Sequence, residues 1–199
     1  VGLDNFIILA RDASFWQSLL RTFYFVGLNM LLAFTAPIML AVLLTDVPRF
    51  KIFFRTLFFL PQMSSGLVIA LLWKLMYEPT PQGFFNQIIA FLNHIPFVNI
   101  ESQQWLLDPA LAMVCVVLPT VWASMGMASL IYLAALGSIP KDFYEAAEVD
   151  GASIWGKFKN VTIPSIIPLI IINFVGTFIA TFQNMGNIFL MTFGGPGEA

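Results

Sequence analysis

Four long stretches of this 199-residue sequence carry almost no charge, and they constrain its fold more than any other feature. A helix needs about 20 mostly apolar residues to cross a hydrocarbon core of roughly 30 Å, and a charge at its centre costs about 2.5–3.5 kcal/mol. The stretches are 23–44, 57–73, about 110–136 and about 161–193. This pattern predicts an all-α, polytopic helical membrane protein with four spans in this sequence.

The composition excludes several other classes of protein. Hydrophobic residues make up 59% of the chain and charged residues only 10%, whereas soluble domains carry about 25% charged residues. The sequence is therefore neither an ordinary soluble enzyme nor a disordered chain, and a formal charge of −2 gives no basic footprint for nucleic acid. One cysteine, Cys115, and one histidine, His94, exclude a disulfide framework and leave too few ligands for a Cys/His metal site, so no metal is expected.

The basic residues predict how the spans are oriented. Six of the nine lysines and arginines lie in the 45–56 and 137–160 loops, and three lie at the other ends of the spans. Because cytoplasmic loops carry the excess of basic residues, both of these loops are expected in the cytoplasm. The 78–109 loop is then outside. It contains an amphipathic piece, 84–91, which is expected to pack as a lid on the membrane surface or to dock an external partner.

The 137–160 loop contains the most informative segment of the chain. Asp142, with Glu145 three residues later, has the form of a helix N-cap and its reciprocal partner. Gly151 is placed where a helix commonly ends in a residue with positive φ. A second short helix is expected over 153–160, ending before Pro164. Two short helices hinged at a glycine predict a plug that sits in a cleft of another protein.

One apparent motif in this loop is a false match. The run from Gly151 to Lys157 has the G-x-x-x-x-G-K spacing of a phosphate-binding loop. However, Phe158 replaces the Ser or Thr that would hold Mg²⁺, and no strand is expected before it. The chain is therefore not expected to hydrolyse ATP or to be an enzyme.

The loop also resembles a known family. Glu145-Ala146-Ala147, Gly151 and Ile163-Pro164 resemble the EAA-x₃-G-x₉-I-x-L-P signature of membrane subunits of binding-protein-dependent ABC importers, with Ile163 where Leu is usual. Other segments resemble the sugar-importer branch related to the maltose and glycerol-3-phosphate permeases. They are 54–61, 136–140, 147–152 and 190–196, and the resemblance extends from about residue 12 to residue 196.

The resemblance implies a function and a set of partners. Residues 1–199 would form a single transmembrane permease domain, an excerpt holding helices two to five of a six-helix core. The partners would be a second, homologous permease subunit, two ATP-binding subunits that hold ATP and Mg, and an extracytoplasmic solute-binding protein. The protein would be located in the cell (inner) membrane of a bacterium or archaeon. The residues implied in ATPase coupling are Glu145, Ala146, Ala147, Asp150, Gly151 and Pro164.

Polar side chains on the fourth span predict where solute passes. At 100° per residue, five of them fall within an arc of about 120°; they are Asn173, Thr177, Thr181, Asn184 and Asn187. Uncharged amides and hydroxyls suit the hydroxyl groups of a sugar, and they equally suit hydrogen bonds between helices. The candidate pathway residues are Gln183, Asn184, Asn187, Trp122 and Gly126. Asn173 and Thr177 are assigned to packing, as is Asn29 in the first span.

Three alternatives remain open from the sequence. A permease of the same family for amino acids, phosphate or polyamines would need a compensating charge near mid-span. An ion-coupled secondary transporter would need ionisable residues within its spans, and the third and fourth spans contain none. A membrane subunit that only grips an ATPase would not need the stripe of amides.

Overall fold

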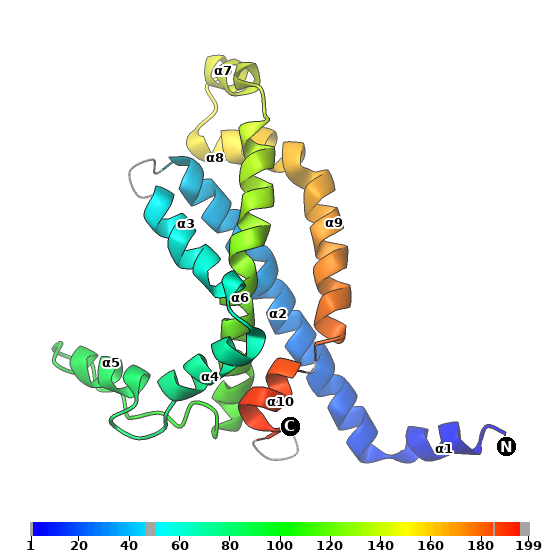
Figure 1. Ribbon diagram of the computed structural model, residues 1–199. Helices are drawn as coiled ribbons and strands as arrows, with labels where there is room; N and C mark the ends of the chain where they lie inside the picture. Colours follow the sequence, from blue (N-terminus) through cyan, green and yellow to red (C-terminus); the bar gives the residue numbers. More distant parts are fainter. Residues whose placement is uncertain (1, 47–50, 185, 196–199) are drawn as a thin grey trace. The chain divides into compact units, whose positions relative to one another are not determined.

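The computed structural model describes residues 2–46, 51–184 and 186–195, and within these ranges it is helical with no strand (Figure 1). This confirms the all-α class. The α-helices are α1 (Asp4–Arg11), α2 (Ala13–Asp46), α3 (Lys51–Phe59), α4 (Gly66–Met76), α5 (Phe84–Leu92), α6 (Pro109–Gly137), α7 (Lys141–Val149), α8 (Ile154–Lys157), α9 (Ile163–Phe182) and α10 (Gly186–Thr192). A 3₁₀ turn, η2, spans Leu60–Met63 and a π turn, η3, spans Phe158–Thr162. Residues 47–50 of the predicted cytoplasmic loop and residue 196 lie outside the described residues.

Three of the described helical runs are long and apolar enough to cross a membrane. They are Ala13–Thr45, Pro109–Gly137 and Ile154–Phe182. The first and third predicted spans are therefore confirmed as uninterrupted helices. The first helix begins ten residues before the predicted span, so it includes polar residues that the hydropathy pattern left outside.

The second predicted span is broken in the structure. Its two halves, Thr56–Met63 and Gly66–Met76, are separated by a break, and only together are they long and apolar enough to cross a membrane. The Ser64 N–H donates to the Pro61 carbonyl at 3.0 Å, which closes the η2 turn. The Ser65 hydroxyl then accepts from the Val68 N–H at 3.4 Å and caps α4. Because serine oxygens satisfy backbone donors that the broken helix leaves free, the chain can restart here.

The fourth predicted span is also broken, so the prediction of one continuous helix to residue 193 is wrong. Helix α9 ends at Phe182, the Asn184 N–H turns back to the Thr181 carbonyl at 3.2 Å, and α10 begins at Gly186. Asparagine and glycine both favour turns over helix interiors. The five-residue stripe therefore does not continue past Thr181 at 100° per residue.

The chain divides into two compact units. The first unit contains residues 1–29, 65–120 and 181–199, and the second contains residues 30–64 and 121–180. Each unit draws on segments far apart in the sequence, which is typical of helices packed side by side.

Asn29 ties three helical segments of the first unit together. It is 5% exposed, and its Nδ2 donates to the Thr120 hydroxyl at 3.3 Å. Its Oδ1 accepts from the Thr181 hydroxyl at 3.3 Å. The predicted packing role of Asn29 is confirmed. Since a buried amide is costly when left unpaired, this triad fixes which faces of the helices meet.

Asn86 organises the long connection between α4 and α6 in the same unit. The amphipathic piece predicted here is confirmed as α5, and Asn86 on it is 1% exposed. Its Nδ2 lies within 3.0–3.5 Å of four backbone carbonyl oxygens, at residues 78, 79, 80 and 103. Its Oδ1 accepts from the Gln103 N–H at 2.9 Å and from the Trp105 indole N–H at 3.2 Å. One side-chain amide therefore holds the start of the connection, at residues 78–80, beside its end, at residues 103–105.

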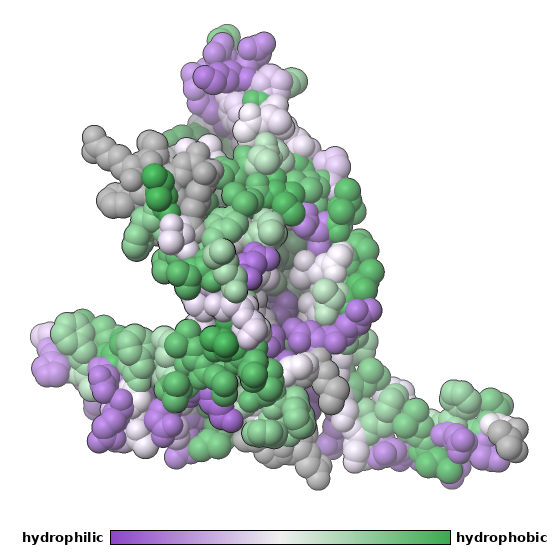
Figure 2. Space-filling model, in the orientation of Figure 1, coloured by the Kyte–Doolittle hydropathy of each residue, from purple (hydrophilic) through white to green (hydrophobic). Residues whose placement is uncertain are grey.

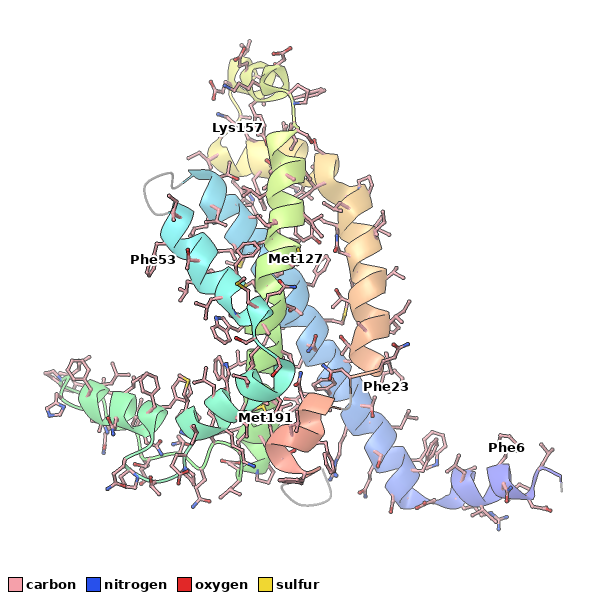
Figure 3. All side chains as sticks on the ribbon, viewed as in Figure 1. Phe6, Phe23, Phe53, Met127, Lys157 and Met191 are labelled. Carbon is pink, nitrogen blue, oxygen red and sulfur yellow. The ribbon has the colours of Figure 1, made fainter. Side chains whose placement is uncertain are left out.

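The second unit packs around Ala41, Tyr132 and Ile166, which come from α2, α6 and α9. Helix α6 also approaches α3 so closely that a Cβ on Gly126 would lie 2.2 Å from the Phe58 carbonyl oxygen. Figure 3 shows these two helices, with Phe53 labelled on α3 and Met127 on α6. Only glycine allows this approach of two backbones.

Replacing Asn86 by Leu should loosen the segment 78–105. The change keeps the branched shape of the side chain but leaves buried carbonyl and amide groups without a partner, which costs at least about 2 kcal/mol. Hydrogen exchange of the full-length subunit in nanodiscs should show the Gln103 amide exchanging at least tenfold faster. Asn93→Leu is the control, because Asn93 is exposed and its side chain bonds to the backbone of a single residue, Ile100, in the described part of the chain. Equal exchange at Gln103 in all three proteins would contradict the role given to Asn86.

Candidate functional site

The segment that carries the sequence signature folds as a helix closed by glycine (α7; Figure 1). Gly151 has φ +74°, a conformation that residues with a Cβ rarely adopt. The Gly151 N–H donates to the Glu148 carbonyl at 3.0 Å, and the Ala152 N–H donates to the Ala147 carbonyl at 2.8 Å. These two bonds form the Schellman motif, which satisfies the last carbonyls of a helix. The expected helix end at Gly151 is confirmed.

The start of α7 differs from the expectation. Asp142 is not the N-cap, because the helix begins at Lys141 and the cap is Pro140, which makes no side-chain capping bond. Proline at this position already has the backbone φ that suits the residue before a helix, and it has no N–H to satisfy. Asp142 instead lies in the first turn, where a negative charge interacts favourably with the helix dipole.

The second short helix also differs from the expectation, because it does not end before Pro164. Helix α8 begins after Ser153, whose hydroxyl accepts from the Gly156 N–H at 3.2 Å. It continues through the π turn η3 into α9, and Pro164 lies in the first turn of α9. Proline cannot donate to the carbonyl four residues earlier and its ring crowds that carbonyl, at Asn160. The π turn, which is wider than an α-helical turn, contains Asn160, the residue whose carbonyl is in conflict with the proline ring.

Two side-chain links fasten α7 to the helical run that leads into α9. The hydroxyls of Tyr144 and Thr162 share a hydrogen bond 3.1 Å long, and Thr162 is 8% exposed. The Lys157 ammonium forms an ion pair with the Glu148 carboxylate. Figure 3 labels Lys157 on α8, below α7. Since one link is at α8 and the other in the π turn, α7 cannot pivot about either contact alone.

The opposite side of α7 is open to solvent. Five of the six predicted coupling residues are exposed and Ala147 is half-buried; the exposed ones are Glu145, Ala146, Asp150, Gly151 and Pro164. Large apolar side chains lie exposed among them, namely Phe143, Val149, Ile154 and Trp155, from 58% to 88% exposed. Figure 2 shows hydrophilic colours over most of α7. Exposed apolar side chains set in a polar surface are typical of a docking surface for another protein.

The linking residues were not found from the sequence. Tyr144 and Glu148 are four residues apart on α7, a spacing that places both side chains on one face. This spacing is a signal that could have separated the attached face from the exposed one. Their partners Thr162 and Lys157 lie 18 and nine residues away, respectively, beyond the reach of helical periodicity.

The candidate pathway residues fall in both units. Trp122 and Gly126 belong to the second unit, where Trp122 is half-buried and Gly126 packs against the α3 backbone. Gln183, Asn184 and Asn187 belong to the first unit, at and just after the break that follows α9. The last three are therefore neighbours along the chain at this break.

The earlier polar residues of the stripe make bonds within the protein. Asn173 Nδ2 donates to the Leu169 carbonyl of its own helix at 2.9 Å, and Thr181 is bonded to Asn29. In contrast, Gln183 is exposed and Asn184 and Asn187 are half-buried. The division between packing residues and candidate pathway residues thus coincides with the end of α9.

Comparison with known proteins gives the family. Residues 7–197 match the model of the family described as binding-protein-dependent transport system inner membrane component. The chain is 33% identical to the lactose transport system permease protein LacF of Rhizobium radiobacter and 32% identical to the trehalose/maltose transport system permease protein MalF of Thermococcus litoralis. Each alignment covers the whole chain and 65% of the relative, so the chain spans about two thirds of their length.

A solved structure has the same fold. The chain aligns with a bacterial ABC transporter involved in the import of the acidic polysaccharide alginate, with a TM-score of 0.79 and 24% identity over 96% of this chain and 68% of that one. The structural match covers 96% of the chain and the family model matches residues 7–197, so both extend over nearly the whole chain. This chain belongs to the family of inner membrane components of binding-protein-dependent transport systems.

Proposed function

We propose that this chain is part of the membrane subunit of an ATP-driven importer for sugars or oligosaccharides. Its family and its similarity to permeases named for lactose and for trehalose and maltose support this proposal. The observation that carries it is the form of α7, which leaves most of the signature residues exposed and is fastened by Tyr144 and Glu148 to the helical run that leads into α9. A connecting loop would need neither property.

The proposed partners follow from this arrangement. Two ATP-binding subunits receive α7 and the equivalent helix of a second permease subunit. An extracytoplasmic binding protein delivers the solute, and the 137–160 loop lies in the cytoplasm of a bacterial or archaeal cell. Closure of the ATP-binding subunits pulls α7, and the two links pass this movement to the start of α9. ATP and Mg are bound by the partner subunits, so this chain contributes movement and a pathway but no hydrolysis.

The proposed pathway uses the amides at the break after α9. A sugar hydroxyl both donates and accepts hydrogen bonds, as a carboxamide does, and an uncharged amide loses less hydration than an ion on entering the spans. Asn184, Asn187 and Gln183 offer such groups where the helix stops. Trp122 offers an aromatic face for a sugar ring. Gly126 acts by letting α3 and α6 approach each other.

Gly151→Val should separate the subunit from its ATPases. A Cβ at Gly151 meets nothing within 4 Å, so only the positive φ opposes the substitution. Because valine rarely adopts this conformation, the Schellman motif opens and the exposed face is no longer presented. In a pull-down of the tagged full-length subunit from membranes, we expect at least a tenfold loss of co-purified ATP-binding subunit.

Gly137→Val is the matched control for this experiment. Gly137 also has open space around the Cβ position, and its φ is not positive. The control should retain the ATPase, whose hydrolysis should rise when the binding protein and its sugar are added. A wild-type subunit that purifies with no ATP-binding subunit would contradict the proposed function.

Tyr144→Phe should keep the ATPase bound but weaken coupling. The substitution removes one hydroxyl from the attached face and leaves the exposed face unchanged. A hydrogen bond of this kind contributes about 0.5–1.5 kcal/mol, so binding-protein-stimulated ATP hydrolysis should fall about two- to tenfold, at unchanged co-purification. Tyr24→Phe, at an exposed tyrosine of α2, is the control. Loss of ATPase binding in Tyr144→Phe would instead place Tyr144 in the docking surface.

Asn184→Leu and Asn187→Leu should lower uptake of the sugar without releasing the ATPase. Each removes an amide from the proposed pathway, and uptake of labelled sugar into proteoliposomes should fall at least fivefold. Asn173→Leu is the control, because its amide is bonded to its own helix. Normal uptake in both pathway variants would assign the amides to helix packing.

A further inference from the structure

A cavity of about 260 Å³ lies in the first unit and is distinct from the docking surface of α7. It is lined by the N-terminal part of α2, by α6, by the last residues of α9, by Asn184 and by α10. Its polar lining includes Ser18, Arg21, Thr22 and Asn184, and Phe25 and Phe182 add aromatic surface. It lies just under the range of about 300–1,000 Å³ typical of drug-sized ligands, so it suits one sugar residue.

One face of α2 supplies most of these groups. Ser18, Arg21, Thr22 and Phe25 are spaced i, i+3, i+4 and i+7, so their side chains lie along one stripe of the helix. The stripe presents a guanidinium between two hydroxyls, and the Thr22 hydroxyl donates to the Ser18 carbonyl at 2.8 Å, which leaves it as an acceptor. The sequence pattern left Arg21 just outside the first span, whereas the structure includes it in the helical run Ala13–Thr45.

The guanidinium of Arg21 is available to a ligand. Among residues 2–46, 51–184 and 186–195, none forms an ion pair or hydrogen bond with it. Arg21 is half-buried, and no acidic residue lines the cavity. Thr45 is the last residue of the apolar helical run, and Arg21 lies 24 residues before it, or about 36 Å along the helix at 1.5 Å per residue. This distance exceeds the hydrocarbon thickness of roughly 30 Å, so a helix that ends at one interface near Thr45 places Arg21 at the other interface, where an arginine is tolerated.

Asn184 adds an amide on the other side of the cavity. The break after α9 places this residue, and in the described part of the chain its side chain has no hydrogen-bond partner. Thr181 also lines the cavity, but its hydroxyl donates to Asn29, so this residue contributes to the shape of the cavity and not to ligand binding. The cavity therefore combines one unpaired positive charge with hydroxyl and amide groups.

We propose that this cavity binds an acidic sugar residue, a uronate, at the outer end of the solute pathway. The planar guanidinium of Arg21 pairs with the two carboxylate oxygens, a geometry that arginine provides and lysine does not. Ser18 and Asn184 bond the ring hydroxyls, and Thr22, whose own proton is donated to the Ser18 carbonyl, accepts from one of them. The proposal rests on the proposed import of sugars and adds to it a preference for acidic sugars. The phosphate of a lipid headgroup has similar chemistry and is the alternative occupant.

The test compares two sugars that differ only at C6, D-galacturonate and D-galactose. The full-length subunit is assembled with its partner subunits in phosphatidylcholine nanodiscs, and sugar binding is measured by saturation-transfer NMR titration. We expect wild type to bind galacturonate at least tenfold more tightly than galactose. Arg21→Gln should abolish this preference, and Arg21→Lys should restore it in part by keeping the charge. Arg11→Gln, on α1 and remote from the cavity lining, should behave as wild type.

Several outcomes would overturn the proposal. One is the absence of any preference for galacturonate in wild type, and another is a preference that survives Arg21→Gln. A third is that wild type retains phosphatidylglycerol in mixed nanodiscs, as seen by native mass spectrometry, while Arg21→Gln does not, with no galacturonate binding; this would assign the cavity to lipid. Failure of the proposed function is distinguishable, because wild type would then import no sugar at all, neutral or acidic.

Discussion

Every backbone N–H and C=O group in the apolar spans must find its partner inside the protein, and this constraint governs the structure. Lipid offers no hydrogen bonds, so the long runs are helical and the chain leaves the helix only where other groups take over. At residues 64–65 the freed backbone groups are satisfied by a 3₁₀ turn and by the Ser65 cap. After α9 the Asn184 N–H is satisfied by a turn to the Thr181 carbonyl. The second of these breaks is also where polar side chains become available to a ligand.

The sequence predicted those features that depend on composition and on local backbone geometry. Long uncharged stretches gave the first and third spans, and the position of Gly151 gave the end of α7, because only a residue without Cβ adopts its φ at low cost. The breaks in the second and fourth spans were missed although a short polar run marks each of them, at 61–65 and 183–187, because a few polar residues in a long apolar stretch are equally compatible with a polar stripe on an unbroken helix. The partners of Tyr144 and Glu148 were missed because contacts between helices depend on the path of the chain between them, which helical periodicity does not encode.

The two faces of α7 divide the work of the loop. Local capping holds the helix in shape, so the exposed face is defined by backbone bonds within residues 146–152. Fastening to α8 and to the π turn depends on side chains, one hydroxyl pair and one ion pair. The proposed docking and the proposed transmission of movement therefore rest on separate groups, and we expect variants to change one without the other. The polar cavity around Arg21 belongs to the other unit, so solute recognition there shares no residue with the coupling loop.

The π turn between α8 and α9 has a consequence for how related chains align. A π turn holds one residue more than the α-helical turn it replaces, so it acts as a one-residue insertion that is absorbed without a loop. Deleting one residue from Phe158–Thr162 would restore an ordinary helical turn and leave the segments on either side close to their present angular register. The same deletion in the regular helix of α9 would rotate everything before it by about 100°. Single-residue insertions and deletions in related chains are therefore tolerated best within this short segment, and a sequence alignment should place a one-residue gap there rather than inside α9.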